Sequence, residues 1–301
     1  MSLFAKDIVQ KRRLCDRDGF CSFSGLIPPD LLTRVVSRMD AVVSGEYESG
    51  LSPHAVHFNS DDPVDKLRKI DQPHLSDSVI FELISHENIG RAIAGLLNAK
   101  FVQVWATQLL IKPPGGMAGH IGWHQDMQHW TTWWRGEVGT FWVAISNVSE
   151  DCGPMQFIRG SHKWGLNENS SFFSDADHAM QRKVIPKPPK SNWEEIPMVM
   201  SGGDGSFHHR FTYHGSGSNL SSEPRRSFAI HVRTERSEAV DEKSVYTAHL
   251  SDEGVCPVIY QAGIKGLRLS ERLLRLYAPY FVAQDTCDCW ISQKPLQEGC
   301  V

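Results

Sequence analysis

The sequence has little of several features that would identify a class of protein at once. Its seven cysteines are odd in number and include no Cys-x-x-Cys pair, so neither a disulfide framework nor a cysteine zinc site is predicted. Lysine and arginine number 31 against 35 acidic residues, and a net charge of −4 provides no basic field for nucleic acid. No apolar run is long enough to span a membrane, and the N-terminal stretch does not resemble a signal peptide.

These absences leave a soluble, intracellular protein as the expectation. Free thiols are typical of a reducing compartment, so we expect a cytoplasmic location. We expect a small molecule as the partner, with no nucleic acid and no membrane. The sequence leaves the oligomeric state open between a monomer and a homodimer.

The composition is that of an ordinary globular chain, with 41% hydrophobic and 22% charged residues in 301. We find no internal repeat and no linker, and therefore predict a single domain over residues 1–301. Helical spacing of apolar residues predicts a helix from Pro29 to Gly45. A second helical block is predicted over 77–99, with Ser85 as the N-cap of its latter part.

Other segments are predicted to be polar loops, strands or a terminal helix. Residues 48–76 and 163–195 are expected to be loops, and 267–281 a helix. Short strand-like runs separated by Gly/Pro turns cover 20–23, 101–112, 139–146, 153–158, 198–200, 205–213 and 226–232. This pattern predicts a mainly β fold with flanking helices (α+β), whose β core lies at about 101–235 in an antiparallel sandwich or barrel.

The chemistry is expected at Trp123-His124-Gln125-Asp126. If this stretch is a strand, His124 and Asp126 point to the same face, because strand side chains alternate. A third ligand is expected from His214, which is followed by a Gly-Ser-Gly-Ser turn. Two histidines and one carboxylate with other positions open form the arrangement of non-haem Fe(II) oxygenases. His208 shares a face with His214 by alternation and competes for the same role.

Arg225 is the expected anchor for an anionic co-substrate. It begins a strand-like run in which it shares a face with Ser227 and Ala229, whose small side chains leave room for a ligand. A guanidinium holds a carboxylate with two parallel charge-assisted hydrogen bonds. Ser216 could add a hydroxyl to the same carboxylate. Taken without the rest of the pattern, Arg225 is better interpreted as a surface charge at a strand start.

Taken together, these motifs resemble the phytanoyl-CoA dioxygenase (PhyH-like) family of Fe(II)/2-oxoglutarate oxygenases. The resemblance covers about residues 15–235 and rests on His124-Gln-Asp126, Gly153-Pro-Met with Arg159-Gly-Ser-His, and His214-Gly-Ser-Gly-Ser-Asn with Arg225. It implies a double-stranded β-helix, that is, a jelly-roll or cupin-like barrel.

The resemblance also implies roles for individual residues. It makes His124, Asp126 and His214 the catalytic iron ligands. It assigns the distal carboxylate of 2-oxoglutarate to Arg225, with Ser216 beside it. Positions that line the co-substrate pocket match Gln125, Gln108, Trp142 and, more loosely, Lys69.

The activity that the resemblance implies uses Fe(II), 2-oxoglutarate and O2. It would hydroxylate an unactivated C–H bond of a small-molecule metabolite or natural-product intermediate and release succinate and CO2. Asp126 favours hydroxylation, because non-haem halogenases carry a small residue at that position.

Several alternatives stay open at this stage. Within the same chemistry these are an acyl-CoA hydroxylase, and desaturation or ring chemistry. Outside it are a cupin-like enzyme without 2-oxoglutarate, a hydroxylase of protein side chains and a metal-free binding barrel. Four tryptophans near the iron motif could either wall the substrate pocket or simply pack: Trp123, Trp130, Trp133 and Trp134.

Overall fold

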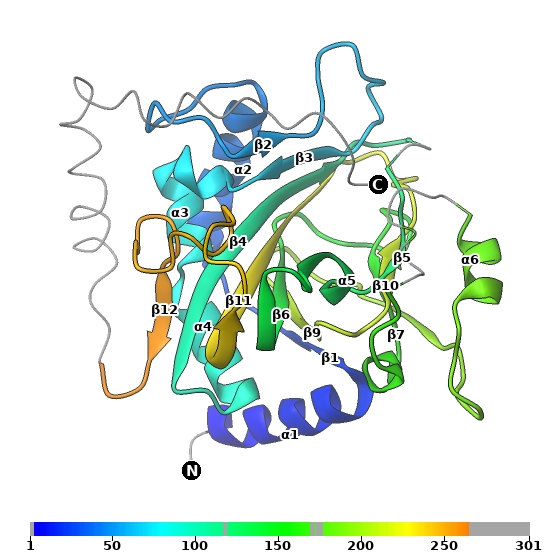
Figure 1. The fold of residues 1–301 in the computed structure, drawn as a ribbon. Helices are drawn as coiled ribbons and strands as arrows, with labels where there is room; N and C mark the ends of the chain where they lie inside the picture. Colours follow the sequence, from blue (N-terminus) through cyan, green and yellow to red (C-terminus); the bar gives the residue numbers. More distant parts are fainter. Residues whose placement is uncertain (1–2, 117–118, 169–171, 173–176, 265–301) are drawn as a thin grey trace.

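The computed structural model describes residues 3–116, 119–168, 172 and 177–264 (Figure 1). Within them, two antiparallel sheets form the centre of the molecule. The larger sheet has the order β1-β9-β6-β11-β4-β3-β2, with β12 also pairing with β4. Its strands are β1 (Phe20–Phe23), β2 (Ala55–Val56), β3 (Arg68–Asp71), β4 (Phe101–Lys112), β6 (Trp134–Ala144), β9 (Gly205–His209), β11 (Arg225–Ala239) and β12 (Val258–Gln261).

The smaller sheet has the order β5-β10-β7-β8. Its strands are β5 (Ile121–His124), β7 (Met155–Ile158), β8 (Glu195–Pro197) and β10 (His214–Ser216). It lies opposite one face of the larger sheet, as Figure 1 shows. The predicted mainly β fold of the double-stranded β-helix type, with flanking helices, is confirmed.

Four helices cover the other face of the larger sheet. They are α1 (Leu3–Asp18), α2 (Pro29–Val43), α3 (Ser78–Ile84) and α4 (Glu87–Leu97). In Figure 1, α3 and α4 lie to the left of β4, whereas α1 runs below β1 and contacts β1 and α4. Alternate residues of the strands, such as Phe228, Ile230 and Val232 on β11, pack against them in the main hydrophobic core. Because strand side chains alternate, the residues between these are left for the opposite, inner face.

The helix α2 shows how the sequence produces this layer. Pro29 occupies the first turn, where a missing N–H costs nothing. Leu31, Val35, Met39 and Val42 follow at helical spacing and are all buried. Burial of each such side chain contributes roughly 1.5–3 kcal/mol to folding.

The second helical block differs in detail from the prediction. It consists of two helices, because α3 ends at Ile84 and α4 begins at Glu87. Ser85 is the C-cap of α3 and not the N-cap of α4. Asp77 is the N-cap of α3 and accepts hydrogen bonds from the backbone N–H groups of Val79 and Ile80. The imidazole of His86 caps the N-terminus of α4. Histidine is not among the residues that N-cap preferences would predict there.

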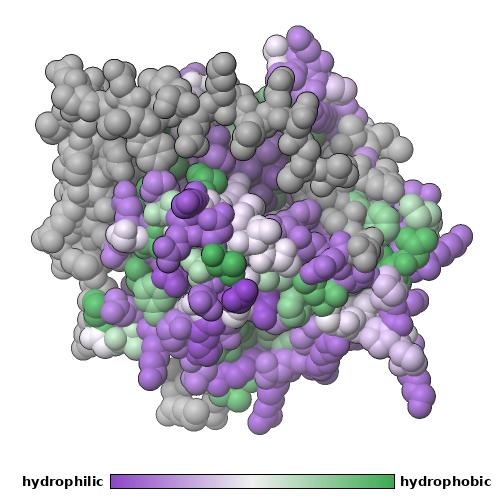
Figure 2. Space-filling model, in the orientation of Figure 1, coloured by the Kyte–Doolittle hydropathy of each residue, from purple (hydrophilic) through white to green (hydrophobic). Residues whose placement is uncertain are grey.

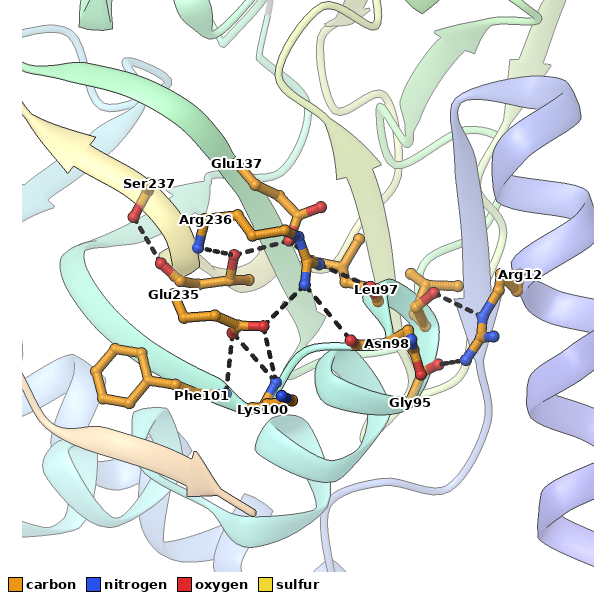
Figure 3. A network of polar contacts seen from close by, with 12 residues as sticks. Arg12, Gly95, Leu97, Asn98, Lys100, Phe101, Glu137, Glu235, Arg236 and Ser237 are labelled. Atoms are coloured by element: carbon orange, nitrogen blue, oxygen red, sulfur yellow. Dashed lines mark hydrogen bonds and ion pairs between the residues drawn. The ribbon is translucent and has the colours of Figure 1, made fainter.

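Polar contacts fasten the C-terminal end of α4 to the sheet (Figure 3). Arg236 on β11 donates to the carbonyl of Leu97 at 2.8 Å and pairs with Glu137 on β6. Arg12 on α1 donates to the carbonyls of Gly95 and Leu96. Cations thus satisfy carbonyl groups that the end of a helix leaves unpaired.

Some predicted elements need correction. The stretch 48–76, predicted as a loop, contains β2, β3 and the 3-10 helix Pro73–Leu75. The polar stretch 163–195 includes α6 (His178–Val184), and the predicted strand 198–200 is reduced to an isolated bridge between Val148 and Met200.

Two further predictions are not tested by the described residues. The predicted helix 267–281 lies outside the described residues, and the single domain over 1–301 stays a prediction. None of the helices in the described part of the chain combines the length and apolar character that a membrane crossing requires.

Candidate metal centre

The inner face of the larger sheet gathers polar residues from five strands. Antiparallel partners directly opposite each other share a face, so the register places these side chains in rows. One row joins Lys112 to Arg225, the next joins Asp71, Gln108, Ala229 and Trp142, and a third joins His231, Thr140 and His208. This alternation confirms the prediction that Arg225 shares a face with Ala229, and it places His231 on the same face. Arg226 instead faces outward and pairs with Asp40 on α2.

Three of the predicted site residues converge between the two sheets. His124 and His214 are direct partners in the pairing of β5 with β10. The Asp126 Oδ1 atom lies 3.9 Å from His124 Nε2 and 3.5 Å from His214 Nε2. The three ligand atoms all lie within 4.8 Å of one another, and each residue is buried. Adjacent ligands of a bound metal ion are about 3 Å apart, so only a small contraction is needed.

The local conformation of Asp126 differs from the prediction. The strand β5 ends at His124, and Asp126 has helical angles (φ −53°, ψ −40°) at the start of the short helix α5 (Met127–Trp130). A strand end followed by a helical turn, and not strand alternation, therefore brings the carboxylate beside the imidazole.

Backbone carbonyls determine which ring nitrogen carries the proton in both histidines. His124 Nδ1 lies 2.8 Å from the Gly122 carbonyl and His214 Nδ1 lies 3.0 Å from the Thr212 carbonyl. A carbonyl only accepts, so each Nδ1 carries the proton and each Nε2 presents its lone pair to the centre. Burial lowers the pKa of His124 to about 4 and that of His214 well below its ordinary value, which keeps both rings neutral.

The Asp126 carboxylate is ionised and held from behind. Burial alone would raise its pKa, but the nearby His214 and the hydrogen bond from His208 outweigh burial and hold the pKa well below its ordinary value. Its Oδ2 atom accepts hydrogen bonds from Thr140 Oγ1 at 2.6 Å and from His208 Nε2 at 3.0 Å. His208 thus donates its Nε2 proton to Asp126, so this nitrogen has no lone pair to offer a metal ion. This favours His214 over His208 as the third ligand.

One carboxylate and two neutral imidazoles facing a common point fit a divalent metal. The set matches the two-histidine, one-carboxylate facial arrangement of non-haem Fe(II) enzymes. The fit is observed in the donor atoms themselves, because their other hydrogen-bonding groups are already satisfied. The roles of His124, Asp126 and His214 as ligands stay a prediction that this geometry supports.

A second feature of the inner face is a pair of buried cations. The Arg225 guanidinium is buried, lies 5.3 Å from the Trp142 ring centroid and donates to the Gly153 carbonyl at 2.6 Å. Its Nε atom has no hydrogen-bond partner in the part of the chain that the structure describes. Lys112, also buried, donates to Ser216 Oγ at 2.7 Å. Burial and the neighbouring Arg225 lower the pKa of Lys112 well below its ordinary value.

Neither cation forms an ion pair with a carboxylate among the described residues. Buried charges are normally paired, so this end of the site fits an anionic ligand. A dicarboxylate such as 2-oxoglutarate meets the requirement. Lys112 was missed at the sequence level, because only the pairing of β4 with β11 brings it opposite Arg225.

The remaining predicted co-substrate residues occupy different surroundings. Gln125 donates to the carbonyls of Gly165 and Phe211 and accepts from the Asn167 N–H, so its amide holds two loops together. Gln108 is half-buried on the inner face, opposite Asp71. The Lys69 ammonium lies 3.7 Å from Asp71 Oδ1. A role in co-substrate binding stays a prediction for all three.

The four tryptophans near the iron motif divide into two clusters. Trp123 packs with Ile158, Ile185 and Tyr213, whereas Trp130, Trp133 and Trp134 pack with Trp105. The second cluster adjoins the centre, because Trp105 stacks on His231 at 5.3 Å and 28°. Trp105 is the residue at which the register of β4 against β11 shifts, which the sequence did not indicate.

The segment after β11 completes the second cluster. Tyr246 lies 4.4 Å from Trp133 between ring centroids. The buried His74 holds the segment: its Nε2 donates to the Val255 carbonyl, and its Nδ1 accepts from the Thr107 hydroxyl on β4. On the side of the molecule seen in Figure 1, Figure 2 shows that hydrophilic residues cover much of the described surface, with small hydrophobic areas between them.

The sequence is similar to those of known proteins. A family model described as phytanoyl-CoA dioxygenase (PhyH) matches residues 15–227. The chain is 28% identical over 172 residues to a probable alpha-ketoglutarate-dependent hypophosphite dioxygenase of Stutzerimonas stutzeri, a match covering 54% of this chain and 56% of that protein. It is 20% identical over 263 residues to the peroxisomal phytanoyl-CoA dioxygenase of Homo sapiens, covering 82% of this chain and 74% of that one. The chain thus spans just over half the length of the S. stutzeri relative.

Solved structures resemble the fold. The epimerase SnoN in complex with Fe3+, alpha ketoglutarate and nogalamycin RO has a TM-score of 0.65 and 17% identity, covering 87% of this chain and 97% of that chain. EctD from S. alaskensis with 2-oxoglutarate and 5-hydroxyectoine has a TM-score of 0.60 and 16% identity, covering 78% and 76%. At these identities the likeness concerns the fold alone.

Proposed function

The chain belongs to the phytanoyl-CoA dioxygenase (PhyH) family of Fe(II)/2-oxoglutarate-dependent dioxygenases, and on this premise we propose that it hydroxylates an unactivated C–H bond of a small-molecule metabolite or natural-product intermediate. One observation carries the proposal for this chain. Between the two sheets, a centre of two neutral imidazoles and a carboxylate shares the interior with Arg225 and Lys112, two buried cations that form no ion pair with a carboxylate among the described residues.

We assign the iron to His124, Asp126 and His214. Arg225 would hold the distal carboxylate of 2-oxoglutarate through its Nε–H, which no described residue accepts, with Ser216 and Lys112 beside it. When bound, iron and 2-oxoglutarate supply oxidation by O2, coupled to decarboxylation of 2-oxoglutarate to succinate and CO2. The protein orients these groups and excludes water, since His124, Asp126 and His214 are each 7% exposed or less.

Asp126 supports hydroxylation as the outcome. Its carboxylate fills the position where a halogenase would leave room for chloride. An acyl-CoA is the second candidate substrate, favoured by the match to the human phytanoyl-CoA dioxygenase over 82% of this chain. A substrate screen read by succinate formation separates the two, and product analysis distinguishes hydroxylation from desaturation or ring chemistry.

The first test is binding, because it needs no substrate. Fe(II) and then 2-oxoglutarate are added to the apo-protein without oxygen, and the weak charge-transfer band of the chelate is recorded in the visible spectrum. We expect the band in the natural chain and its loss in His214→Ala and Arg225→Ala.

Each variant has a matched control next to it in the sequence or the fold. Arg226→Ala alters the neighbouring arginine on the outer face, where it contacts Asp40. His209→Ala alters a histidine beside His162, whose ring centroid is 5.6 Å away, and not at the metal centre. Both controls should keep the band. Absence of the band from folded natural protein would contradict the assignment of iron and 2-oxoglutarate to these residues.

A further inference from the structure

The two oxygens of Asp126 have different surroundings. Oδ1 faces the Nε2 atoms of His124 and His214. Oδ2 accepts two hydrogen bonds, from Thr140 at 2.6 Å and from His208 at 3.0 Å. An ionised carboxylate oxygen that accepts two short bonds has its preferred lone-pair directions occupied.

The protons in this arrangement can be assigned from chemistry. The Thr140 hydroxyl has one proton, and it must go to the carboxylate, which only accepts. His231 Nδ1 lies 2.9 Å from the same hydroxyl and must therefore donate to it. His208 donates from Nε2 to Oδ2 for the same reason. His231 therefore donates to Thr140, and Thr140 donates to Asp126. His208 is the second donor to the same carboxylate oxygen.

Sheet register makes this arrangement rigid. Thr140 on β6 is the direct partner of both His231 on β11 and His208 on β9. All three side chains are buried, and the ring of Phe157 packs against His208 with 5.1 Å between centroids. Donors on three neighbouring strands of one sheet cannot move independently, so Oδ2 is held at a fixed place.

We propose that Thr140 and His208 are positioning residues that keep Asp126 a monodentate ligand, through Oδ1 alone. A carboxylate free to turn could bind a metal ion through both oxygens. In a six-coordinate centre, His124, His214 and Asp126 through one oxygen leave three positions. Two of these are needed for the keto and carboxylate oxygens of 2-oxoglutarate and one for O2. A second Asp126 oxygen would occupy one of them. This inference rests on the proposed function of the same centre.

The test distinguishes the effect of losing the two hydrogen bonds from the effect of changing the shapes of the Thr140 and His208 side chains. Thr140→Val and His208→Leu remove the donors, whereas Thr140→Ser and His208→Gln retain an O–H and an N–H. Binding of Co(II), and then of 2-oxoglutarate to the Co(II)-loaded protein, is measured by calorimetry. The Co(II) absorption spectrum reports the coordination number.

In Thr140→Val and His208→Leu, we expect the affinity of the loaded protein for 2-oxoglutarate to fall on the order of 10- to 100-fold, a loss as large as the one that removal of an outer partner of a metal ligand usually causes in metal affinity or activity. Co(II) affinity should fall much less, because the released oxygen becomes an additional ligand. The Co(II) spectrum before 2-oxoglutarate is added should change. Thr140→Ser and His208→Gln should restore the natural spectrum and most of the affinity.

His209→Gln is the control, since His209 follows His208 in the same strand and contacts His162 instead of Asp126. Thermal unfolding of each apo variant is recorded first, and a donor-removal variant that does not fold is replaced by Thr140→Ala or His208→Ala. Natural affinity and spectrum in the donor-removal variants would overturn the inference, as would equal losses in the donor-retaining pair. Failure of the natural chain itself to bind 2-oxoglutarate would instead refute the proposed function.

Discussion

Replacing His74 by glutamine should make the stability of this protein less sensitive to acid. His74 is fully buried, with Nδ1 2.7 Å from Thr107 Oγ1 and Nε2 2.9 Å from the Val255 carbonyl. The carbonyl can only accept, so Nε2 carries the proton and Nδ1 accepts from the hydroxyl. A neutral ring therefore satisfies both contacts, and a glutamine amide can still donate to Val255.

The magnitude follows from the pKa of His74. Burial lowers it to about 4, from an ordinary value of 6.5. The unfolded chain therefore binds the proton first as the pH falls. The stability that His74 contributes is fully present above pH 6.5 and is lost progressively between 6.5 and 4. By linkage, the loss at pH 5 is about 2 kcal/mol relative to pH 7.5.

The assay is urea unfolding of the apo-protein at pH 7.5 and pH 5, followed by tryptophan fluorescence. We expect the free energy of unfolding to fall between these pH values by about 2 kcal/mol more in the natural chain than in His74→Gln. The other buried histidines contribute to both proteins and cancel in the comparison. The control is His54→Gln, at an exposed histidine, which should retain the natural pH dependence. Equal pH dependence in the natural chain and His74→Gln would refute the reasoning.

Three further predictions concern the site. Arg225→Lys keeps the charge but loses the planar fork, so 2-oxoglutarate should bind on the order of tenfold more weakly by calorimetry, and unchanged binding would contradict its role. Asp126→Ala should fold but form no substrate-dependent succinate, and a variant with full iron-dependent turnover would disprove the ligand assignment. Gly153→Ala should lose about 1–3 kcal/mol of stability by calorimetric melting. Gly153 has φ +68°, and its added Cβ would lie 2.4 Å from the Gly217 carbonyl oxygen.

Local patterns predicted a large part of the fold. The strand over 101–112 was predicted with the bounds that β4 has, because a long run of strand-forming residues ends at a Pro-Pro-Gly turn. The short β3 was missed, because residues 48–76 are polar and its Lys69 and Asp71 side chains face the site instead of a hydrophobic core. The start of α4 was misplaced, because an imidazole cap carries no recognisable signal in the sequence.

For the site, the sequence by itself determined the types of residue and, on β11, the face on which they lie. Alternation placed Arg225 beside Ser227 and Ala229 and opposite Phe228, and this face is the inner one. The motif spacing and the turn after His214 singled out His124, Asp126 and His214, and the structure brings these three together.

Only the tertiary structure decided which strands become neighbours. The pairing of β4 with β11 sets Lys112 opposite Arg225, and the pairing of β6 with β9 sets Thr140 opposite His208 behind Asp126. The physical reason is that a side-chain pattern with a period of two records the face of a strand but not its partner. Partner and register depend on how distant segments pack around a common core, a choice made by the whole chain at once.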